Sequence, residues 1–276
     1  MKTNVLNDLI TTGSINKETI EIFSKNTRDN SNLNVNIDTT SGVIFIEDFY
    51  VGNVEYEKGN YKENSSNLEF NEFENYEDKE DSKRRVDDFK DYIKDKKVCD
   101  FGCGKGSFLR LAREYSNNLY GVELQENYAI LLENNGIRCE DKINKHKTMF
   151  DTIFSFHTLE HLPNQIEVLK NLKNYINIGG SLIIEVPHAN DFLLKKLEVE
   201  EFKEFTLWSQ HLILHTKKSL TNFLTYSGYK DIEIVGFQRY GIANHLGWLK
   251  NKKPGGHKSE LANIETPDLL EEYQNA

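Results

Sequence analysis

The regular alternation of strand and helix patterns between residues 82 and 187 is the feature that most constrains the fold. A helical segment, SKRRVDDFKDYIKD, comes first and places Val86, Phe89, Tyr92 and Ile93 at helical spacing with charges between them. Five strand-like segments follow, separated by helices or turns: KVCDFG, NLYGVEL, IRCED, FDTIFSFH and SLIIEVP. Because parallel strands need right-handed crossovers, this alternation predicts a doubly wound, mostly parallel α/β sheet covered on both faces.

The segment before this alternation has a different character. Residues 1–81 are polar and strongly acidic, which is compatible with disorder, and SGVIFIEDFY is their one convincing strand-like run. Aromatic residues recur through the segment and favour an N-terminal arm that lies on the body as a lid. These residues are Phe45, Phe49, Tyr50, Tyr56, Tyr61, Phe70, Phe73 and Tyr76.

The segment after residue 187 leaves the alternation again. Residues 190–212 suggest a helical insertion, TKKSLTNFLTYSG a helix, and YKDIEIVGFQR a long strand that runs antiparallel at the sheet edge. The sequence thus predicts a Rossmann-like domain over residues 82–238 with a seven-stranded sheet that includes an antiparallel strand. Residues 239–276 are expected to form a loop or flap rich in glycine, histidine and lysine.

Composition excludes several classes of protein. The chain has 276 residues, with 34 Lys and Arg against 44 Asp and Glu, for a net charge of −10. An acidic chain without a long basic tract at its ends is a poor candidate for non-specific nucleic-acid binding. No apolar run approaches the roughly 20 residues of a membrane span, and the first residues lack the apolar core of a signal peptide. We therefore expect a cytoplasmic protein without membrane insertion, and the sequence leaves its oligomeric state open.

The number and spacing of the three cysteines are consistent with a protein in a reducing compartment. Cys99, Cys103 and Cys139 are odd in number and form no C-x-x-C pair. We expect them to pack as small apolar residues. A redox or metal role is the alternative.

The stretch KKVCDFGCGKGSFLRLA places a glycine-rich turn between the first strand of the alternation and the next helix. A dinucleotide fold expects G-x-G-x-x-G, but Ser107 occupies the third glycine position and Gly106 precedes it. Asp100 at the end of the strand would repel a pyrophosphate, whereas it suits a ligand that carries an ammonium group. Glu123 closes the second strand, where an acid can accept hydrogen bonds from ribose hydroxyls.

These residues, with FDTIFSFHTLEHL and NIGGSLIIEVP, resemble class I S-adenosylmethionine-dependent methyltransferases over roughly residues 84–237. The resemblance implies S-adenosylmethionine as cofactor and S-adenosylhomocysteine as product. It implies cofactor contacts from Asp100, Gly102, Gly104 and Glu123. Residues that would border the adenine or complete the pocket are Leu124, Asp141 and Phe156.

A finer resemblance is to methyltransferases of bacterial capsule or O-antigen polysaccharide biosynthesis. It rests on RRVDDFKDYIKDKKVCDFGCGKGSFL, HTLEHLP, QHLILHTKKSLTNFLTYSGY, ANHLGWL and KPGGH. It implies a small, phosphorylated or nucleotide-activated acceptor and an O-methyl product. The alternatives are N- or C-methylation of a sugar precursor and a non-catalytic cofactor-binding subunit; an NAD-dependent oxidoreductase is disfavoured by Ser107 and Asp100.

Histidines are the candidate bases for removing a proton from a hydroxyl acceptor. His157 and His161 flank the end of the fourth strand, where open parallel sheets bind ligands, and His211 follows the insertion. Each has a structural alternative: His157 can supply backbone contacts only, His161 can brace a turn, and His211 can pack beneath the insertion. His215 is expected to be structural and His146 solvated, and no metal site is assigned.

The tail carries a lysine cluster in an otherwise acidic chain. KNKKPGGHK places Lys250, Lys252, Lys253 and Lys258 around a Pro-Gly-Gly turn. Lysines of this kind commonly form a solvated surface. The alternative is a flap that grips a phosphate-bearing acceptor through ammonium groups and glycine N–H groups.

Overall fold

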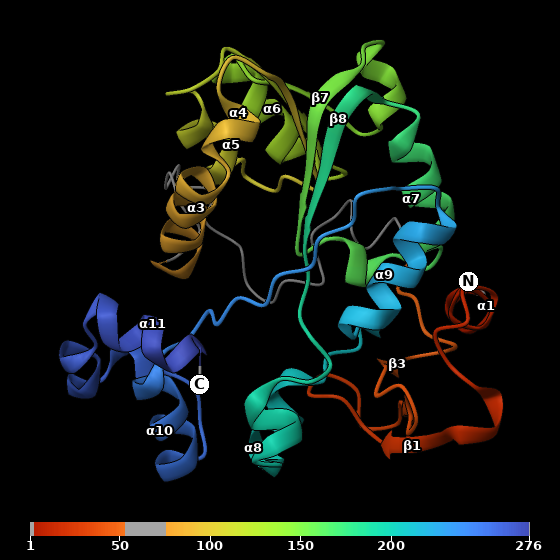
Figure 1. The fold of residues 1–276 in the computed structure, drawn as a ribbon, viewed down its shortest axis with the longest axis vertical. Helices are drawn as coiled ribbons and strands as arrows, with labels where there is room; N and C mark the ends of the chain where they lie inside the picture. Colours follow the sequence, from red (N-terminus) through yellow and green to blue (C-terminus); the bar gives the residue numbers. More distant parts are fainter. Residues whose placement is uncertain (1–2, 53–75, 276) are drawn as a thin grey trace. The chain divides into compact units, whose positions relative to one another are not determined.

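The computed structural model describes residues 3–52 and 76–275 and separates into two compact units (Figure 1). The first unit comprises Met1–Asn4 and Tyr50–Val186, and the second comprises Val5–Phe49 and Pro187–Ala276. The second unit therefore combines an early and a late part of the chain. The extent of the catalytic domain that we infer from the sequence, residues 82–238, stays a prediction.

The first unit is built on a parallel sheet in the order β6-β5-β4-β7-β8. Neighbouring strands pair in register, with Val98 beside Leu119 on one side and Thr152 on the other. The strands are β4 (Lys97–Phe101), β5 (Asn118–Val122), β6 (Arg138–Glu140), β7 (Phe150–Phe156) and β8 (Ile176–Glu185). All five are strands that the alternation predicts, and their order is the Rossmann-like order.

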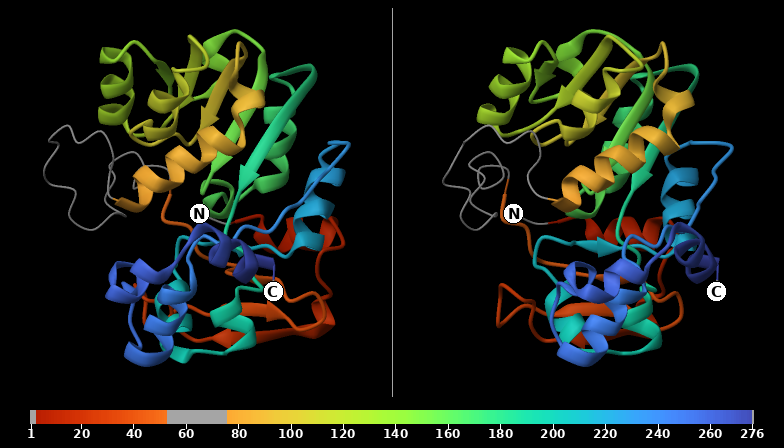
Figure 2. Two further views of the ribbon diagram at one scale, coloured as in Figure 1. Left: turned by 60° about the vertical axis from the view of Figure 1, so that its left-hand side comes forward. Right: turned by 90° about the vertical axis from the view of Figure 1, so that its left-hand side faces the viewer.

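Helices cover both faces of this sheet. They are α3 (Tyr76–Asp88), α4 (Lys90–Ile93), α5 (Ser107–Ala112), α6 (Glu126–Asn134) and α7 (Gln165–Lys173), with short 3₁₀ helices η2 (Ile143–His146) and η3 (Leu159–His161). In Figure 1, α4, α5 and α6 lie on one side of β7 and β8, and α7 lies on the other; Figure 2 shows the same sheet from two further directions.

Alternation along each strand produces two cores. Val98 packs with Phe108 and Leu132 on the face covered by α5 and α6, whereas its neighbour Cys99 packs with Leu172 of α7 on the other. Successive strand side chains point to opposite faces, so both faces of β4 must be apolar. This requirement explains why the adjacent residues Val98 and Cys99 of β4 are both apolar.

The second unit contains an antiparallel sheet in the order β1-β2-β3-β9. Its strands are β1 (Ile20–Ser24), β2 (Val35–Asp38), β3 (Ile44–Phe45) and β9 (Ile213–Leu214). Ile44 of β3 pairs with Leu214 of β9, which joins the two parts of the chain in one sheet. Val35, Ile37 and Ile46 complete this core together with Leu194 and Leu207.

Helices complete the second unit. They are α1 (Val5–Thr11), α8 (Glu200–Thr206), α9 (Lys217–Tyr226), α10 (Ile242–Asn251) and α11 (Pro267–Asn275), with the π-helix η4 (Phe192–Lys196) and the 3₁₀ helices η1 (Lys17–Thr19), η5 (Gly256–Lys258) and η6 (Glu260–Ile264). Thr216 caps α9 with a capping box to Ser219. Within the segment 190–212, where we expected a helical insertion, η4 and α8 are helical, and α9 lies within the helix expected from TKKSLTNFLTYSG. None of the helices among the described residues has the length and apolar character needed to cross a bilayer.

The structure differs from the sequence-based prediction in the number and place of strands. A seven-stranded sheet is not confirmed, since the described residues contain a five-stranded parallel sheet and a separate antiparallel one. Residues 229–239 form no strand, and Val235 is 75% exposed. The alternation there predicted a strand, but no described strand pairs with it.

The two ends of the chain are also more structured than expected. The arm predicted for residues 1–81 contains α1 and three strands, not one, whereas its aromatics Tyr56, Tyr61, Phe70 and Phe73 lie outside the described residues. The tail contains α10, whose inner face buries Ala243, Gly247 and Trp248. Local composition did not predict these N-terminal elements or α10, because their apolar residues pack against residues far away in sequence.

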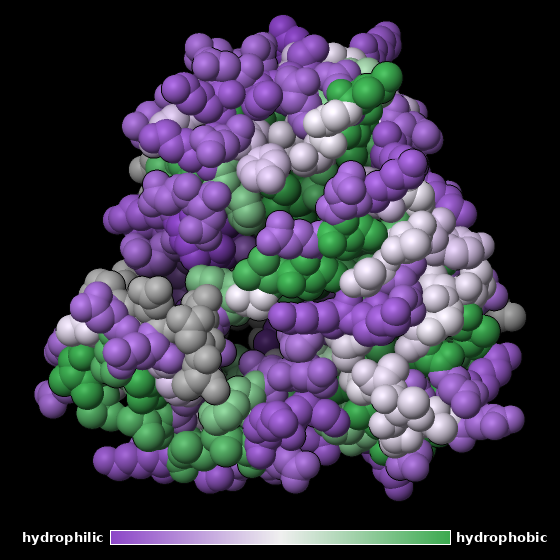
Figure 3. Space-filling view, viewed as in Figure 1, coloured by the Kyte–Doolittle hydropathy of each residue, from purple (hydrophilic) through white to green (hydrophobic). Residues whose placement is uncertain are grey.

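The outer face of α10 carries leucines beside its lysines. Leu246 and Leu249 are 43% and 45% exposed, and Leu261 and Ile264 of η6 are also exposed. Figure 3 shows hydrophobic side chains gathering over this part of the second unit. The segment predicted as a loop or flap therefore contains a helix with apolar residues on its inner and outer faces.

Candidate cofactor and active site

The glycine turn after β4 forms the predicted cofactor loop in the first unit. Gly102, Gly104 and Gly106 all have positive φ angles, of 81°, 54° and 73°. A Cβ at Gly106 would lie 2.1 Å from a methyl carbon of Leu132, so this glycine permits close packing of the turn against α6. A Cβ at Gly104 would meet nothing within 4 Å, so the turn is open at this residue.

Glu123 fixes the shape of this turn. Its Oε2 accepts a hydrogen bond of 2.8 Å from the N–H of Gly104, and its Oε1 accepts one of 2.9 Å from the N–H of Gln125. A carboxylate oxygen can accept more than one hydrogen bond. The predicted role toward a ribose is therefore compatible with these contacts, and it stays a prediction.

Asp100 provides the test of whether the site fits the predicted cofactor. The residue is 3% exposed, and its Oδ1 has no hydrogen-bond partner among the described residues. Burial, with a smaller contribution from the charge of Glu123 and opposition from Arg85, raises the pKa of Asp100 to about 7. A buried carboxyl with an unused acceptor beside an open glycine turn fits the ammonium group of a methionine-derived cofactor.

The other predicted cofactor residues lie in different surroundings. Leu124 and Asp141 are both half-buried, and Asp141 forms a 2.7 Å ion pair with Lys145. The hydrogen bond from Lys145 holds the pKa of Asp141 below its usual value. The Phe156 ring packs against Phe108 in the core, which leaves mainly its backbone for ligand contacts.

His157 is held between two carboxylates at the end of β7. Its Nδ1 lies 3.3 Å from Oε1 of Glu160, and its Nε2 lies 3.3 Å from Oε1 of Glu185. Glu185 at the end of β8 also binds the guanidinium groups of Arg84 and Arg85 from α3. The backbone of His157 has a φ of 49°, an uncommon value for a residue with a side chain.

This network changes the expected role of His157. Burial opposes its protonation, but the hydrogen bond to Glu160 and the nearby carboxylate of Glu185 outweigh that effect and raise the pKa of His157 to about 9. Burial would raise the pKa of Glu185, but the hydrogen bonds from Arg85 and the neighbouring charge of His157 hold it well below its usual range. An imidazolium at neutral pH cannot accept a proton, so the network favours a positioning role for His157 over that of base.

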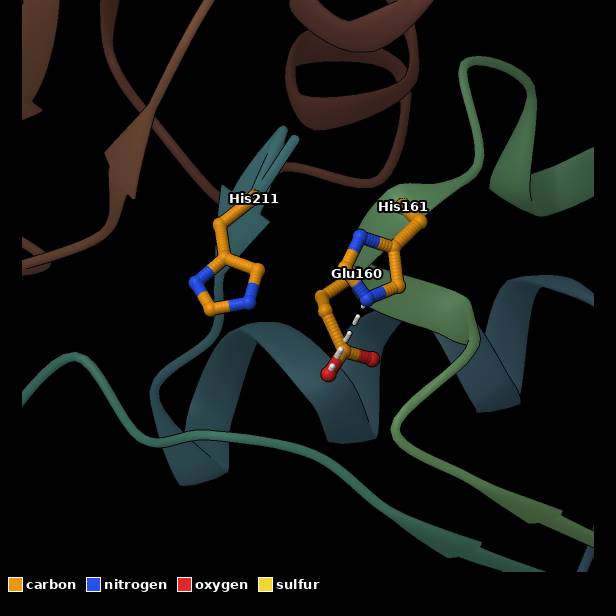
Figure 4. Close-up of side chains that lie close together, drawn as sticks. All are labelled: Glu160, His161 and His211. Atoms are coloured by element: carbon orange, nitrogen blue, oxygen red, sulfur yellow. Dashed lines mark ion pairs between the residues drawn. The ribbon is translucent and has the colours of Figure 1, made fainter. Parts of the chain in front are cut away.

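His161 lies beside a buried carboxylate. It ends η3, its side chain is 16% exposed, and its Nε2 lies 4.0 Å from Oε1 of the fully buried Glu160 (Figure 4). A carboxylate beside an imidazole can hold the ring in one orientation and stabilise its charged form. Glu160 therefore lies next to both histidines of this segment.

The glycine turn and the histidine segment are adjacent. A Cβ at Gly102 would lie 2.2 Å from Oγ1 of Thr158, between His157 and His161 in sequence. Both segments follow strands of the same parallel sheet, at the edge where such sheets bind ligands. The sequence-based prediction of a shared site for the glycine turn, His157 and His161 therefore has a geometric basis within the first unit.

His211 belongs to the second unit. It precedes β9, its backbone N–H donates to the carbonyl of Trp208, and its ring meets the Trp208 ring edge-on with 5.3 Å between the centroids. Its neighbour His215 is 1% exposed and bonded to Ser219, which confirms its structural role. The catalytic role of His211 stays a prediction.

His146 is not solvated as expected. Its Nε2 lies 2.8 Å from the carbonyl oxygen of Gly121, and its ring packs against Tyr120 and Phe150. Burial lowers the pKa of His146. The charged residues beside it in sequence gave no sign of the aromatic contacts, because those contacts come from two strands.

Sequence reasoning missed four residues of the charged network. They are Arg84, Arg85, Glu160 and Glu185. The available signal was the position of the two carboxylates: Glu160 lies inside HTLEHL and Glu185 at the end of a buried strand, where an acid requires a partner.

Comparison with known proteins identifies the family. Residues 68–234, more than half of the chain, match a family described as a methyltransferase domain. The chain belongs to this methyltransferase family. The predictions of an enzyme, a Rossmann-like fold and S-adenosylmethionine as cofactor are confirmed.

Curated relatives of the methyltransferase have different acceptors. It is 25% identical over 162 residues to the tRNA U34 carboxymethyltransferase of Nautilia profundicola, covering 54% of this chain and 52% of the relative. It is 27% identical over 108 residues to the ubiquinone biosynthesis O-methyltransferase of Coxiella burnetii, covering 36% and 46%. The chain thus spans about half the length of the curated relatives it matches.

Among solved structures, a SAM dependent methyltransferase from Archaeoglobus fulgidus matches with a TM-score of 0.46 and 23% identity. The match covers 55% of this chain and 70% of that chain. The finer resemblance to enzymes of capsule or O-antigen biosynthesis is not shown by these comparisons.

Proposed function

We propose that this methyltransferase transfers a methyl group to an oxygen atom of a small, phosphorylated or nucleotide-activated precursor of a bacterial surface polysaccharide. The observation that carries the proposal is the proximity of the open glycine turn to the segment with Glu160 and His161. S-adenosylmethionine supplies an electrophilic methyl group on a sulfonium. The chain must then align the acceptor and remove its proton.

Asp100, Gly104 and Glu123 are the residues that we expect to hold the cofactor. The unused acceptor of Asp100 would bind its ammonium group, the open face at Gly104 would admit it, and Glu123 would accept from its ribose. Leu124 and Asp141 are expected at the adenine, with backbone contacts from Phe156.

The pairing of His161 with Glu160 supports a hydroxyl as the acceptor group. A hydroxyl is weakly nucleophilic until a base accepts its proton, and such catalysis typically contributes about 10²- to 10⁴-fold. A neutral amine already has its lone pair and needs less help. N- and C-methylation are the alternatives, and His211 is a second candidate for a base or for contacts with the acceptor.

The acceptor is expected to be a small molecule. The relative from ubiquinone biosynthesis carries O-methyltransferase in its name, whereas the Nautilia relative is named for tRNA. A net charge of −10 disfavours RNA, since binding to phosphates needs clustered basic residues. The cytoplasmic location stays part of this proposal.

The test is a methyl-transfer assay with S-adenosylmethionine and a panel of nucleotide-linked sugars, phenols, amines and tRNA, read by mass spectrometry. We expect a methyl ether on a sugar precursor. Replacing His161 with asparagine should slow single-turnover methyl transfer by about 10²-fold while affinity for S-adenosylhomocysteine is retained. Methylated nitrogen, carbon or RNA would contradict the proposed acceptor, and failure to bind S-adenosylhomocysteine would contradict the function as a whole.

A further inference from the structure

The second unit contains a cavity of about 510 Å³ that no function described above uses. Its volume falls in the range of small-molecule sites, roughly 300–1,000 Å³. The walls come from residues 26–28, from α8, and from the end of α10 with the loop that follows. The lining residues are Asn26, Thr27, Arg28, Glu201, Glu204, Phe205, Trp248, Lys252, Lys253 and Pro254.

A tight turn holds Arg28 at the cavity. The carboxylate of Asp29 accepts hydrogen bonds from the N–H of Ser209, at 3.0 Å, and from the hydroxyls of Ser209 and Thr27. The N–H of Arg28 donates to the carbonyl of Leu207 at 2.8 Å. The Arg28 guanidinium lies over the Trp208 ring, 4.7 Å from its centroid, so this cation is presented by a fixed backbone.

One face of α8 supplies two carboxylates and an aromatic ring. Glu201, Glu204 and Phe205 stand three and four residues apart, which places them on the same side of the helix. The Phe205 ring is 42% exposed and rests against Trp248, itself 2% exposed, with 5.2 Å between the ring centroids. A large exposed ring held against a buried one is a platform on which a ligand can stack.

The loop after α10 is fixed at the opposite side. Lys252 ends the helix with a φ of 56°, and its Nζ lies 3.3 Å from the carboxylate of Glu201. Gly256 packs so closely on the helix that a Cβ there would lie 2.7 Å from Cα of Asn244. The Pro-Gly-Gly turn therefore positions Lys252 and Lys253 at the cavity instead of forming a free flap.

We propose that this cavity binds a phosphorylated sugar. Arg28 and Lys253 supply cations for the phosphate, Phe205 offers a face to the apolar side of a sugar ring, and Glu204 can accept hydrogen bonds from hydroxyls. Carboxylates would repel a simple anion such as free phosphate, and this cavity contains two, Glu201 and Glu204. The combination fits a ligand with one anionic end and several hydroxyl groups.

The inference rests on the proposed function for one point only, that the natural ligand is the phosphorylated acceptor or a part of it. The same chemistry is present in a sugar 1-phosphate and in a nucleoside-diphosphate sugar. RNA is disfavoured, because Glu201 and Glu204 would repel a continuous phosphate backbone.

Calorimetric titration of the full chain tests the proposal with glucose 1-phosphate, UDP-glucose, UDP, glucose, inorganic phosphate and tRNA as probes. We expect a sugar phosphate to bind at least tenfold more tightly than glucose or phosphate alone. Tighter binding of UDP-glucose than of both UDP and glucose 1-phosphate would identify the nucleotide-linked form as the ligand. Equal binding of glucose 1-phosphate and UDP-glucose would identify the free sugar phosphate.

Three variants locate the binding. Arg28→Met, Glu204→Gln and Phe205→Ala should each weaken the sugar phosphate by about tenfold or more, with unchanged thermal stability. Lys230→Met, at an exposed lysine of the same unit outside the cavity, is the matched control and should bind as the original chain does.

Binding of tRNA in place of sugar phosphates would overturn the inference, and so would sugar-phosphate binding that all three variants leave unchanged. Absence of binding by every sugar phosphate would also overturn it. Titration of S-adenosylhomocysteine in the same samples separates the two proposals. If S-adenosylhomocysteine binds and sugar phosphates do not, only the cavity assignment fails.

Discussion

Among single residues, burial and neighbouring charges shift the pKa values of Asp100 and His157, at the sheet edge, away from those usual for their residue types. Burial raises the pKa of Asp100 to about 7, while two carboxylates raise the pKa of His157 to about 9. At neutral pH the aspartate is partly protonated and the histidine is charged. The ionised fraction of Asp100 can bind a cation, whereas the charged His157 cannot act as a base.

The raised pKa of Asp100 predicts that cofactor binding depends on pH. A ligand ammonium group prefers the ionised carboxylate, so affinity for S-adenosylhomocysteine should rise as the pH passes through about 7. Between pH 6 and 8 we expect an increase of about tenfold, measured by calorimetry. The variant Asp100→Asn should bind weakly with a flat profile, and a wild-type profile without slope would show that Asp100 does not contact the ammonium group.

The charged His157 predicts a pH dependence of stability. Its folded-state pKa lies above its usual value of 6.5, so its contribution to stability is complete below about pH 6.5 and is lost as the pH rises through about 9. The free energy of unfolding should therefore decrease from pH 6.5 to 9.5 in urea titrations. His157→Asn should reduce this decrease, and asparagine tolerates the positive φ of this residue.

Comparing the original chain with His157→Asn isolates the contribution of His157 to the pH dependence, since the other groups that titrate near pH 9 are present in both. Parallel pH profiles for the variant and the original chain would contradict the charged state of His157. Because 36% of the side chain is exposed, added salt should weaken the effect.

Among the structural elements, the glycine turn contains one glycine needed for packing, Gly106, and one at an open face, Gly104. Gly106→Ala adds a methyl group that would overlap Leu132 and forces an alanine to a φ of 73°. We expect a loss of about 2 kcal/mol or more in the free energy of unfolding. Gly104→Ala has a similar backbone cost of about 1 kcal/mol but no overlap, so its main effect should be on cofactor affinity.

Denaturant titration and calorimetry of both variants distinguish these effects. We expect Gly106→Ala to lose more stability than Gly104→Ala. For Gly104→Ala, we expect the loss of S-adenosylhomocysteine affinity to be the larger effect. The reverse pattern would mean that Gly104, not Gly106, is the packing residue of the turn.

In the whole molecule, the second unit depends on both ends of the chain. Its sheet places β1, β2 and β3 beside β9, and its core joins Val35 and Ile44 to Leu207 and Leu214. A chain that begins at residue 50 would expose this apolar surface of the late segment. We therefore expect that shortened chain to be destabilised and aggregation-prone.

Limited proteolysis and thermal unfolding of the shortened chain test this dependence. An arm that only covers the body could be removed with little change in the melting temperature. A shortened chain that melts like the full one would contradict the shared core. The prediction that residues 45–80 cover the cofactor falls largely on residues 53–75, outside the described part, and stays a prediction.

Local patterns in the sequence determined the parallel sheet and the position of the cofactor turn. The apolar residues of β4, the glycines after it, and the acids Asp100 and Glu123 are close in sequence to the elements they serve. Their spacing alone therefore indicated a strand, a turn and a ligand with an ammonium group. The candidate base His161 was found in the same way, from its position after a buried strand.

Tertiary structure alone decided the state of His157, the cavity beside α8 and the sheet of the second unit. Glu185 meets Arg85 across 100 residues of sequence, and Asp29 meets Ser209 across 180. Neither local propensity nor hydrophobic periodicity carries information about such pairs. Their formation depends on which segments the fold brings together, and burial then sets the charge that each group carries.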